Sequence, residues 1–317
     1  QLLNLFLFQY LLYSLISPYL LYYTFSNIKI KRLNYNISML IEEVKLKIGN
    51  TPLLRLKEIE DRFNLNNEIF IKDESKNYTG SIKDRPALNM ILNYINDGLI
   101  NESTTIIEAT SGNMGISLAA LCESFNLPCI IVMPKSMSKQ RQEMIKQYHA
   151  KLLLVDGTME DAKKEVEKLA KENKDYLIFN QFNNKHNPSA HYLNTAREIE
   201  NQLKDIDYMF ICFGSSGTIT GISTYYKDKG YKTKFIAIEP EESPLLSKGY
   251  ASKHIIQGIG ANFIPSILNK ENIFEVITVN GDKAKEMAKL INQNTSLFVG
   301  ISTGANVLGI INYIKKQ

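Results

Sequence analysis

Tryptophan is absent from the 317 residues of this sequence, and cysteine and histidine are rare. The three cysteines, Cys122, Cys129 and Cys212, lie in or beside apolar runs. Such a sparse, odd set is typical of reduced intracellular thiols rather than of a disulfide framework. The four histidines lack the spacing of metal ligands, so we expect no structural metal. These absences predict a cytoplasmic protein.

An excess of charge is also missing. The formal net charge is only +4, and no long stripe of lysine and arginine accompanies it, so a nucleic-acid surface is not indicated. Hydrophobic residues make up 44% of the chain and charged residues 22%, which is ordinary for a globular enzyme. A chain of this length can bury a large core in one or two domains.

The N-terminal extension, residues 1–38, differs from the rest. Its first 27 residues carry no charge and could span a membrane by hydropathy alone, with cations following between positions 29 and 32. The cationic start and cleavage site of a signal peptide are lacking. Because the first methionine is Met39, we favour the interpretation that this extension is upstream DNA translated by mistake. A membrane anchor is the alternative.

From Met39 onward, short β-branched runs alternate with amphipathic stretches. Eight strands are predicted: Ile69–Lys72, Thr104–Glu108, Cys129–Met133, Leu152–Val155, Tyr176–Phe179, Met209–Phe213, Phe235–Ile238 and Val276–Val279. Most lack alternation of apolar and polar residues, as expected in a parallel sheet buried on both faces. Helices are predicted over Thr158–Asn173, with Thr158 and Asp161 as a capping box, and over Gly281–Asn294. This order predicts an α/β fold with crossover connections.

Lys83 lies in the loop Thr79–Pro86, where Pro86 suits the first turn of a helix. The positive end of that helix and Arg85 would both lower the pKa of the ammonium group. A lysine that attacks an aldehyde needs its neutral form. Taken alone, a solvated surface lysine is the more frequent alternative.

Three further loops lead into helices. Glu108–Gly115 offers hydroxyls, an amide and backbone N–H groups that could hold a carboxylate. Phe213–Gly221 places a Gly/Ser/Thr turn between an apolar strand and a helix, as where backbone amides cradle a phosphate, but it is not a Walker A motif. Gly300–Asn306 lies at another expected strand-to-helix junction. For each loop taken alone, the alternative to ligand binding is an ordinary capped helix start or a structural turn.

In this order the four loops resemble the cysteine synthase and cystathionine β-synthase family of pyridoxal-phosphate (PLP) enzymes. Further matching segments are Ile48–Leu53, Asn180–Phe182, Ile238–Pro240, Ser243–Leu246 and Gln257–Gly260, and the likeness covers Val44 to Lys315. It implies fold type II (tryptophan synthase β-like), with two three-layer α/β domains and PLP in the cleft between them. The large PLP-binding domain would combine 39–82 with 185–317, and the small substrate-loop domain would span 83–184.

The resemblance also implies a role for each site residue. Lys83 would form the Schiff base with PLP and shuttle the Cα proton. Asn113 would bond the phenolate oxygen of PLP, and Ser302 would face its pyridine nitrogen. The phosphate would be bound by Gly214, Ser215, Ser216, Gly217 and Thr218. The substrate would be held by Thr110, Ser111, Gln181, the backbone of Met114, Gly258 and Asn262.

Several positions depart from the family pattern. Met114 stands where threonine is usual, and Ser215 and Ser216 replace Thr and Gly, so that Ser216 makes the loop backbone less permissive. Asn262 replaces glycine and could orient a water or an amino group, but it is equally explained as an amide tolerated at positive φ. The chain ends at Gln317, where relatives usually continue, so we expect a fragment.

The implied chemistry is β-elimination and β-replacement on cysteine, O-acetylserine or serine through an aminoacrylate, interconverting sulfide and cysteine. A neutral serine at the pyridine nitrogen suits prompt loss of the β-leaving group. A cysteine-degrading lyase that releases hydrogen sulfide and forms serine is the alternative. A silent binding protein on the same fold is a third hypothesis, against which Lys83 argues. We expect a homodimer with small-molecule partners, and a membrane partner only if the N-terminal extension is genuine.

Overall fold

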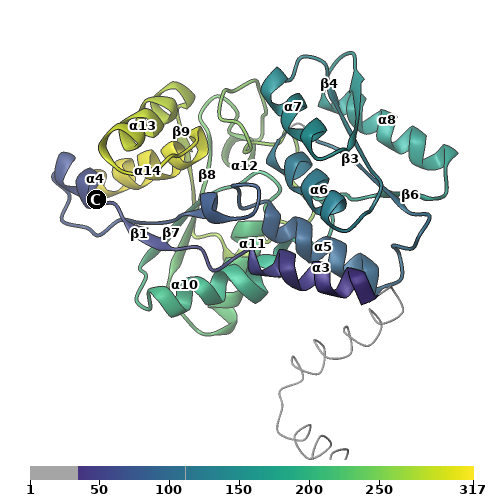
Figure 1. The fold of residues 1–317 in the computed structure, drawn as a ribbon. Helices are drawn as coiled ribbons and strands as arrows, with labels where there is room; N and C mark the ends of the chain where they lie inside the picture. Colours follow the sequence, from purple (N-terminus) through teal and green to yellow (C-terminus); the bar gives the residue numbers. More distant parts are fainter. Residues whose placement is uncertain (1–34, 111) are drawn as a thin grey trace, which may run out of the picture.

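The computed structural model describes residues 35–110 and 112–317, which contain two parallel sheets and one antiparallel strand pair (Figure 1). The antiparallel pair joins β1 (Leu53–Arg55) and β2 (Phe70–Lys72). The four-stranded sheet has the order β5-β4-β3-β6, from β3 (Thr105–Ala109), β4 (Cys129–Pro134), β5 (Lys151–Val155) and β6 (Tyr176–Ile178). The three-stranded sheet has the order β7-β8-β9, from β7 (Tyr208–Cys212), β8 (Lys234–Pro240) and β9 (Glu275–Val279).

Helices cover both faces of the four-stranded sheet. Ile106 and Ile131 share one core with helices α5 (Asp84–Asn96), α6 (Asn113–Ser124) and α7 (Lys139–Gln147). Ile107 and Val132, on the opposite face, pack against α8 (Met159–Glu172). Successive strand residues point to opposite faces, so two helical layers can bury one apolar strand. Burial of each such side chain stabilises the fold by about 1.5–3 kcal/mol.

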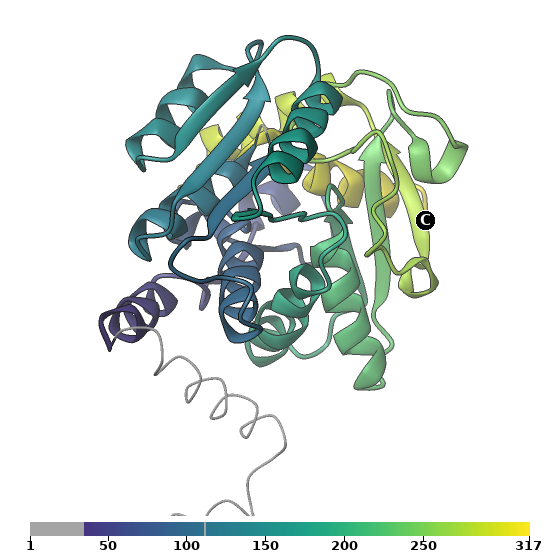
Figure 2. The ribbon, with the colours of Figure 1, turned by 90° about the vertical axis from the view of Figure 1, so that its right-hand side faces the viewer.

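The three-stranded sheet is covered in the same way. Met209 and Phe235 pack with α10 (Ala196–Gln202) and α11 (Gly217–Asp228). Ile238, on the other face, packs with α13 (Gly281–Asn294) and α14 (Ile301–Ile314). Figure 2 shows the teal strands of the first sheet and the green strands of the second in separate halves of the molecule. Both halves are therefore three-layer α/β units.

Shorter elements connect these layers. A continuous helical stretch runs from α9 (His186–Ala190) through a π-helical segment (His191–Thr195) into α10. The others are α3 (Tyr35–Leu46), α4 (Lys57–Arg62), α12 (Leu245–Lys248) and the 3₁₀ segments Glu74–Lys76 and Lys270–Asn272. Helix α3 begins inside the predicted N-terminal extension, and its Ile41 and Val44 pack into the core of the four-stranded sheet.

All eight predicted strands are present, with ends shifted by one or two residues. The predicted helices are confirmed as α8 and α13, and the Thr158–Asp161 capping box is formed. Strand β1 was not predicted. The prediction of a strand before Gly300 is wrong. The Val299 N–H donates to Asn292 Oδ1 at 2.7 Å, and Asn292 Nδ2 donates to Val299 O at 3.1 Å. The Asn292 side chain therefore makes the hydrogen bonds that a neighbouring strand would make.

The membrane-anchor alternative concerns the N-terminal extension, residues 1–38. Residues 1–34 lie outside the described part of the chain. Within residues 35–110 and 112–317, every helix is too short or too polar to cross a bilayer.

Candidate active site

Lys83 immediately precedes helix α5. Removal of its ammonium group from water lowers the pKa of Lys83, in the direction that the sequence predicts. The predicted contribution of Arg85 is wrong. Arg85 is not among the causes of the shift, and its guanidinium bonds Glu74 at 2.6 Å and Glu198 at 2.7 Å, so that two carboxylates balance its charge. Burial alone therefore brings the Lys83 amine closer to its nucleophilic, neutral form.

The turn before Lys83 is held by the first residue of the helix. The Asp84 carboxylate accepts hydrogen bonds from the Thr79 backbone N–H at 2.7 Å and from Thr79 Oγ1 at 2.5 Å. Burial raises the pKa of Asp84, and hydrogen bonds from Ser117 and Thr79 oppose that shift. A fully buried acid with this many donors fixes the 79–84 loop and hence the position of Lys83.

The Gly214–Thr218 loop joins β7 to the start of α11. Ser216 has φ 71°, a left-handed conformation that is uncommon for serine and confirms the expected backbone constraint. The Ser216 hydroxyl is buried and lacks a hydrogen-bond partner among the described residues. An unpartnered hydroxyl beside the free N–H groups of a 12-residue helix is a set of donors that fits a phosphate.

His191 contacts this loop from the π-helical segment that follows α9. Its Nε2 lies 3.3 Å from Thr218 Oγ1, and its Nδ1 lies 3.0 Å from Thr195 Oγ1. Burial, and then the positive charges of Arg85 and Lys83, hold the pKa of His191 well below its usual range. Burial therefore favours the neutral form of the ring. Sequence reasoning missed His191, whose spacing from Thr195 is the one available signal.

Two more segments meet the carboxyl end of β7. Ser302, in the first turn of α14, accepts a hydrogen bond through its carbonyl from Cys212 Sγ at 3.6 Å. The Gly260 N–H donates to Phe213 O at 3.0 Å. A Cβ on Gly214 would lie 2.4 Å from Gly258 O, so this contact requires glycine. The phosphate loop, Ser302 and the Gly258 turn are thus brought together where open α/β sheets bind ligands.

A second group of predicted residues lies at the end of β3. Thr110 is buried and bonds Val132 O through its backbone N–H. Two residues earlier, Glu108 accepts bonds from Asn180 N at 2.9 Å and from Gln181 N and Nε2 at 3.4 Å. Burial raises the pKa of Glu108 to about 7. Glu108, which sequence analysis did not select, therefore holds Gln181 at the end of β3, two residues before Thr110.

The remaining predicted residues differ in exposure. The Met114 side chain is buried in the core, which leaves only its backbone for a ligand. Asn113 and Asn262 are exposed, and no hydrogen bond within the described ranges joins either to another site residue. Ser111 lies outside the described residues. The positive-φ explanation of Asn262 is wrong, because Gly258 and Gly260 take the left-handed angles of that turn.

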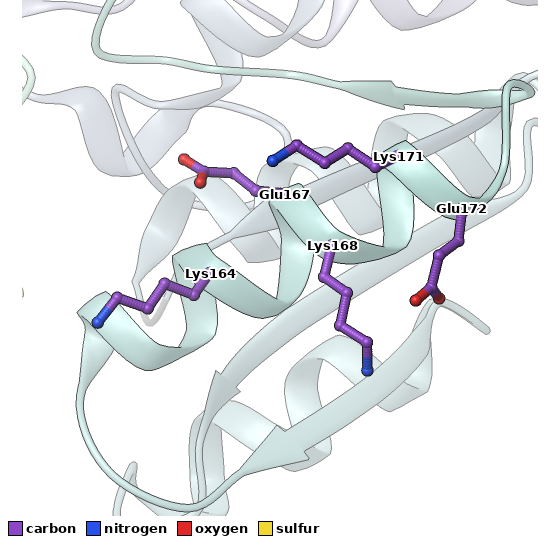
Figure 3. A pocket seen from close by; sticks show the side chains of 5 residues that line it. All are labelled: Lys164, Glu167, Lys168, Lys171 and Glu172. Atoms are coloured by element: carbon purple, nitrogen blue, oxygen red, sulfur yellow. The ribbon is translucent and has the colours of Figure 1, made fainter.

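A separate surface hollow is lined by five residues of α8, shown in Figure 3: Lys164, Glu167, Lys168, Lys171 and Glu172. These are charged side chains of one helix, and no predicted site residue is among them. The hollow is not the candidate active site.

Comparisons with known proteins agree with this geometry. The family model described as pyridoxal-phosphate dependent enzyme matches residues 44–317. Cysteine synthase B of Campylobacter jejuni is 45% identical over 278 residues, which cover 87% of this chain and 91% of that protein. A hydrogen sulfide-producing enzyme from Fusobacterium nucleatum (Fn1220) is 39% identical, with a TM-score of 0.81 and coverage of 87% and 92%. Cysteine synthase from Entamoeba histolytica is 36% identical, with a TM-score of 0.82 and coverage of 87% and 82%. The chain belongs to the family of pyridoxal-phosphate dependent enzymes, and its architecture is fold type II.

Proposed function

We propose that this protein is a cysteine synthase-type enzyme, which eliminates and replaces the β-substituent of cysteine, O-acetylserine or serine. The observation that carries the proposal is the placement of Lys83. Lys83 is half-buried at the start of α5, where burial lowers the pKa of its ammonium group, and the phosphate loop carries the unpartnered, buried Ser216 hydroxyl. A reactive lysine beside a phosphate cradle is what PLP chemistry requires.

The residues present fit PLP. The loop Gly214–Thr218 would hold its phosphate, with the unpartnered Ser216 hydroxyl as one donor. Ser302 would face the pyridine nitrogen, and Asn113 would bond the phenolate oxygen. When bound, PLP withdraws electrons from the Cα of an amino acid. Because a serine hydroxyl carries no negative charge, Ser302 would leave that withdrawal moderate, which favours rapid loss of a β-leaving group.

The other residues act on the substrate. The neutral Lys83 amine would accept the Cα proton and return it after the nucleophile has added. Thr110, Ser111 and Gln181, with the Met114 backbone, would bind the substrate carboxylate. Thr110 and Gln181 are both buried, so their hydrogen bonds to that charge would be stronger than in water.

The alternative is a cysteine-degrading lyase that releases hydrogen sulfide and forms serine. Similarity to the Fusobacterium nucleatum hydrogen sulfide-producing enzyme supports it. Purified holoenzyme should be given cysteine alone, and separately O-acetylserine with sulfide. Faster cysteine formation in the second assay supports the synthase, and faster sulfide and serine formation in the first supports the lyase. Absence of both reactions would refute the proposed function.

The assembly and location belong to the same proposal. The small domain would span 83–184 and the large domain 39–82 with 185–317, which is supported by one parallel sheet in each. A homodimer would elute at twice the chain mass in size-exclusion chromatography with light scattering. Cytoplasmic location is supported by the three free cysteines, Cys122, Cys129 and Cys212.

A further inference from the structure

Asn187, in helix α9, lies between the two groups of site residues. Its side chain is fully buried. The Nδ2 group donates to Gln181 O at 2.8 Å and to Ser215 Oγ at 3.1 Å. Gln181 belongs to the turn beside Glu108, and Ser215 belongs to the phosphate loop. One amide group therefore joins segments that lie 34 residues apart in the sequence.

The orientation of this amide follows from its partners. Exchange of its oxygen and nitrogen would place Oδ1 against the Gln181 carbonyl oxygen, so that two acceptors would face each other. With Nδ2 in its present place, Oδ1 faces the start of α11 and has no hydrogen-bond partner in the described part of the chain. A Cβ on Gly217 would lie 1.8 Å from Asn187 Oδ1 and 2.5 Å from Asn187 Cγ, so no residue larger than glycine fits at position 217.

The contact also determines what Ser215 can offer a ligand. Because Ser215 Oγ accepts the Asn187 N–H, its own hydroxyl hydrogen is free to donate elsewhere. Ser215 is buried in the loop that would bind the PLP phosphate. A hydroxyl whose acceptor side is already used is oriented as a donor, which is the role that a phosphate oxygen requires.

We propose that Asn187 is a positioning residue, which holds the carboxylate-binding turn at Gln181 against the phosphate loop at Ser215. This inference rests on the proposed function, since it assumes that Gln181 binds the substrate carboxylate. Loss of the Asn187 amide frees the Gln181 carbonyl and the Ser215 hydroxyl together, so the geometry for the substrate carboxylate and the affinity for PLP both change.

The test compares two amines that differ in one group. L-serine carries a carboxylate and ethanolamine does not, so the ratio of their half-saturating concentrations measures recognition of the carboxylate. Both are titrated into purified holoenzyme while the absorbance of the cofactor is followed. In Asn187→Ala, loss of a buried hydrogen bond of about 1 kcal/mol should raise the half-saturating L-serine concentration roughly five-fold. The value for ethanolamine should stay within about two-fold, since the two hydrogen bonds that are lost, to Gln181 O and Ser215 Oγ, are neutral contacts away from its amine.

Asn89 supplies a matched control. Its Nδ2 also donates to a backbone carbonyl, His186 O at 2.7 Å, and to a serine hydroxyl, Ser189 Oγ at 2.9 Å, but it contacts neither Gln181 nor the phosphate loop. Asn89→Ala should leave the serine-to-ethanolamine ratio unchanged. If Asn187→Ala does not fold, Asn187→Asp takes its place in the test. Aspartate keeps the side-chain volume but lacks both donor hydrogens, so we expect the same loss of carboxylate recognition.

A second measurement uses the close approach to Gly217. Gly217→Ala should weaken PLP binding by the apoenzyme more than roughly ten-fold, because the new methyl group overlaps Asn187. Adding Asn187→Ala should recover part of that loss, since the overlapping amide is then gone. Additive losses in the double variant would show that the two residues do not interact and would overturn the proposal.

The outcomes separate this inference from the proposed function. If Gln181→Ala alters the serine-to-ethanolamine ratio and Asn187→Ala does not, the positioning role is refuted while the function stands. Equal weakening of both amines in Asn187→Ala indicates general destabilisation and also refutes it. If Gln181→Ala leaves the ratio unchanged, the assigned role of Gln181 fails, and the positioning role fails with it.

Discussion

Arg85 offers a quantitative test of how the start of α5 is held. The side chain is 3% exposed and lies between two carboxylates, with Nε 2.6 Å from Glu74 Oε2 and Nη1 2.7 Å from Glu198 Oε1. Its Nη2 donates to Thr51 Oγ1 at 2.9 Å, and Lys72 Nζ lies 2.8 Å from Glu198 Oε2. We predict that removal of the guanidinium strongly lowers the free energy of unfolding.

The magnitude follows from the pKa of Glu198. Burial opposes ionisation of this carboxyl, yet hydrogen bonds and charge from Arg85, with a bond from Lys72, lower its pKa to about 2. Against the ordinary value of 4.5, that shift corresponds to about 3 kcal/mol of stability. Loss of one partner of a buried pair typically costs about 3–5 kcal/mol, because the other charge stays buried. Arg85→Met should fall in this range.

The pH dependence has a definite sign. The folded pKa of Glu198 is lowered, so its stabilising contribution is fully present above pH 4.5 and is lost as the pH falls from 4.5 towards about 2. The difference in unfolding free energy between the parent protein and Arg85→Met should therefore be largest near neutral pH. It should shrink as Glu198 becomes protonated.

The assay is thermal unfolding with PLP held constant, in Arg85→Met, Glu198→Gln and the double variant. A loss of about 3 kcal/mol should lower the midpoint by roughly 5 °C. Glu198→Gln should destabilise the parent protein but partly rescue Arg85→Met, because it neutralises the unpaired carboxylate. Equal effects of Glu198→Gln in both backgrounds, or an effect of Arg85→Met that does not change with pH, would refute this reasoning.

Three further predictions concern the chemistry. Lys83→Ala should abolish the absorbance of lysine-bound PLP and lower turnover by roughly 10²- to 10⁴-fold or more; normal turnover would contradict the assignment. Ser302→Asp places a negative charge at the pyridine nitrogen, so it should shift the absorbance spectrum and slow β-elimination relative to side reactions, and an unchanged spectrum and rate would count against the placement. Asn262→Asp supplies a base that asparagine lacks and should speed serine formation from cysteine in a pH-dependent way, with Asn262→Gly as control; equal rates in all three forms would make this position a bystander.

The strands were predictable because they are apolar runs, and central strands such as β4 are buried along their whole length. Strand β1 was missed because three partly exposed residues carry too little pattern. Capping residues are local, which is why α8 was predicted with its capping box. The segment before Gly300 looked like a strand because it is apolar. There, contacts of the Asn292 amide replace sheet pairing, and no local pattern reveals them.

The candidate site also has one part that was predictable from the sequence and one part that was not. Its loops were predictable as segments, because lysine, glycine, serine and threonine gather at helix starts. The buried partners were not. His191 looked like one of four scattered histidines until Thr195 and Thr218 were found beside it. Arg85 was expected to act on Lys83, and its carboxylate partners at positions 74 and 198 could be found only from the fold.

Two buried polar side chains whose contacts the sequence did not reveal share a property that bears on function. Asn187 joins Gln181 to Ser215, and Arg85 joins Glu74 to Glu198, so each is a buried polar group bonded to distant segments. Loss of these partners would be costly at either place, and the hydrogen bonds that both side chains donate can form in only one arrangement of the segments. A reaction on an amino acid needs its carboxylate, its Cα and the PLP phosphate held at fixed separations. Polar contacts that tolerate a single arrangement supply that constraint, whereas apolar packing around the same loops would permit slippage.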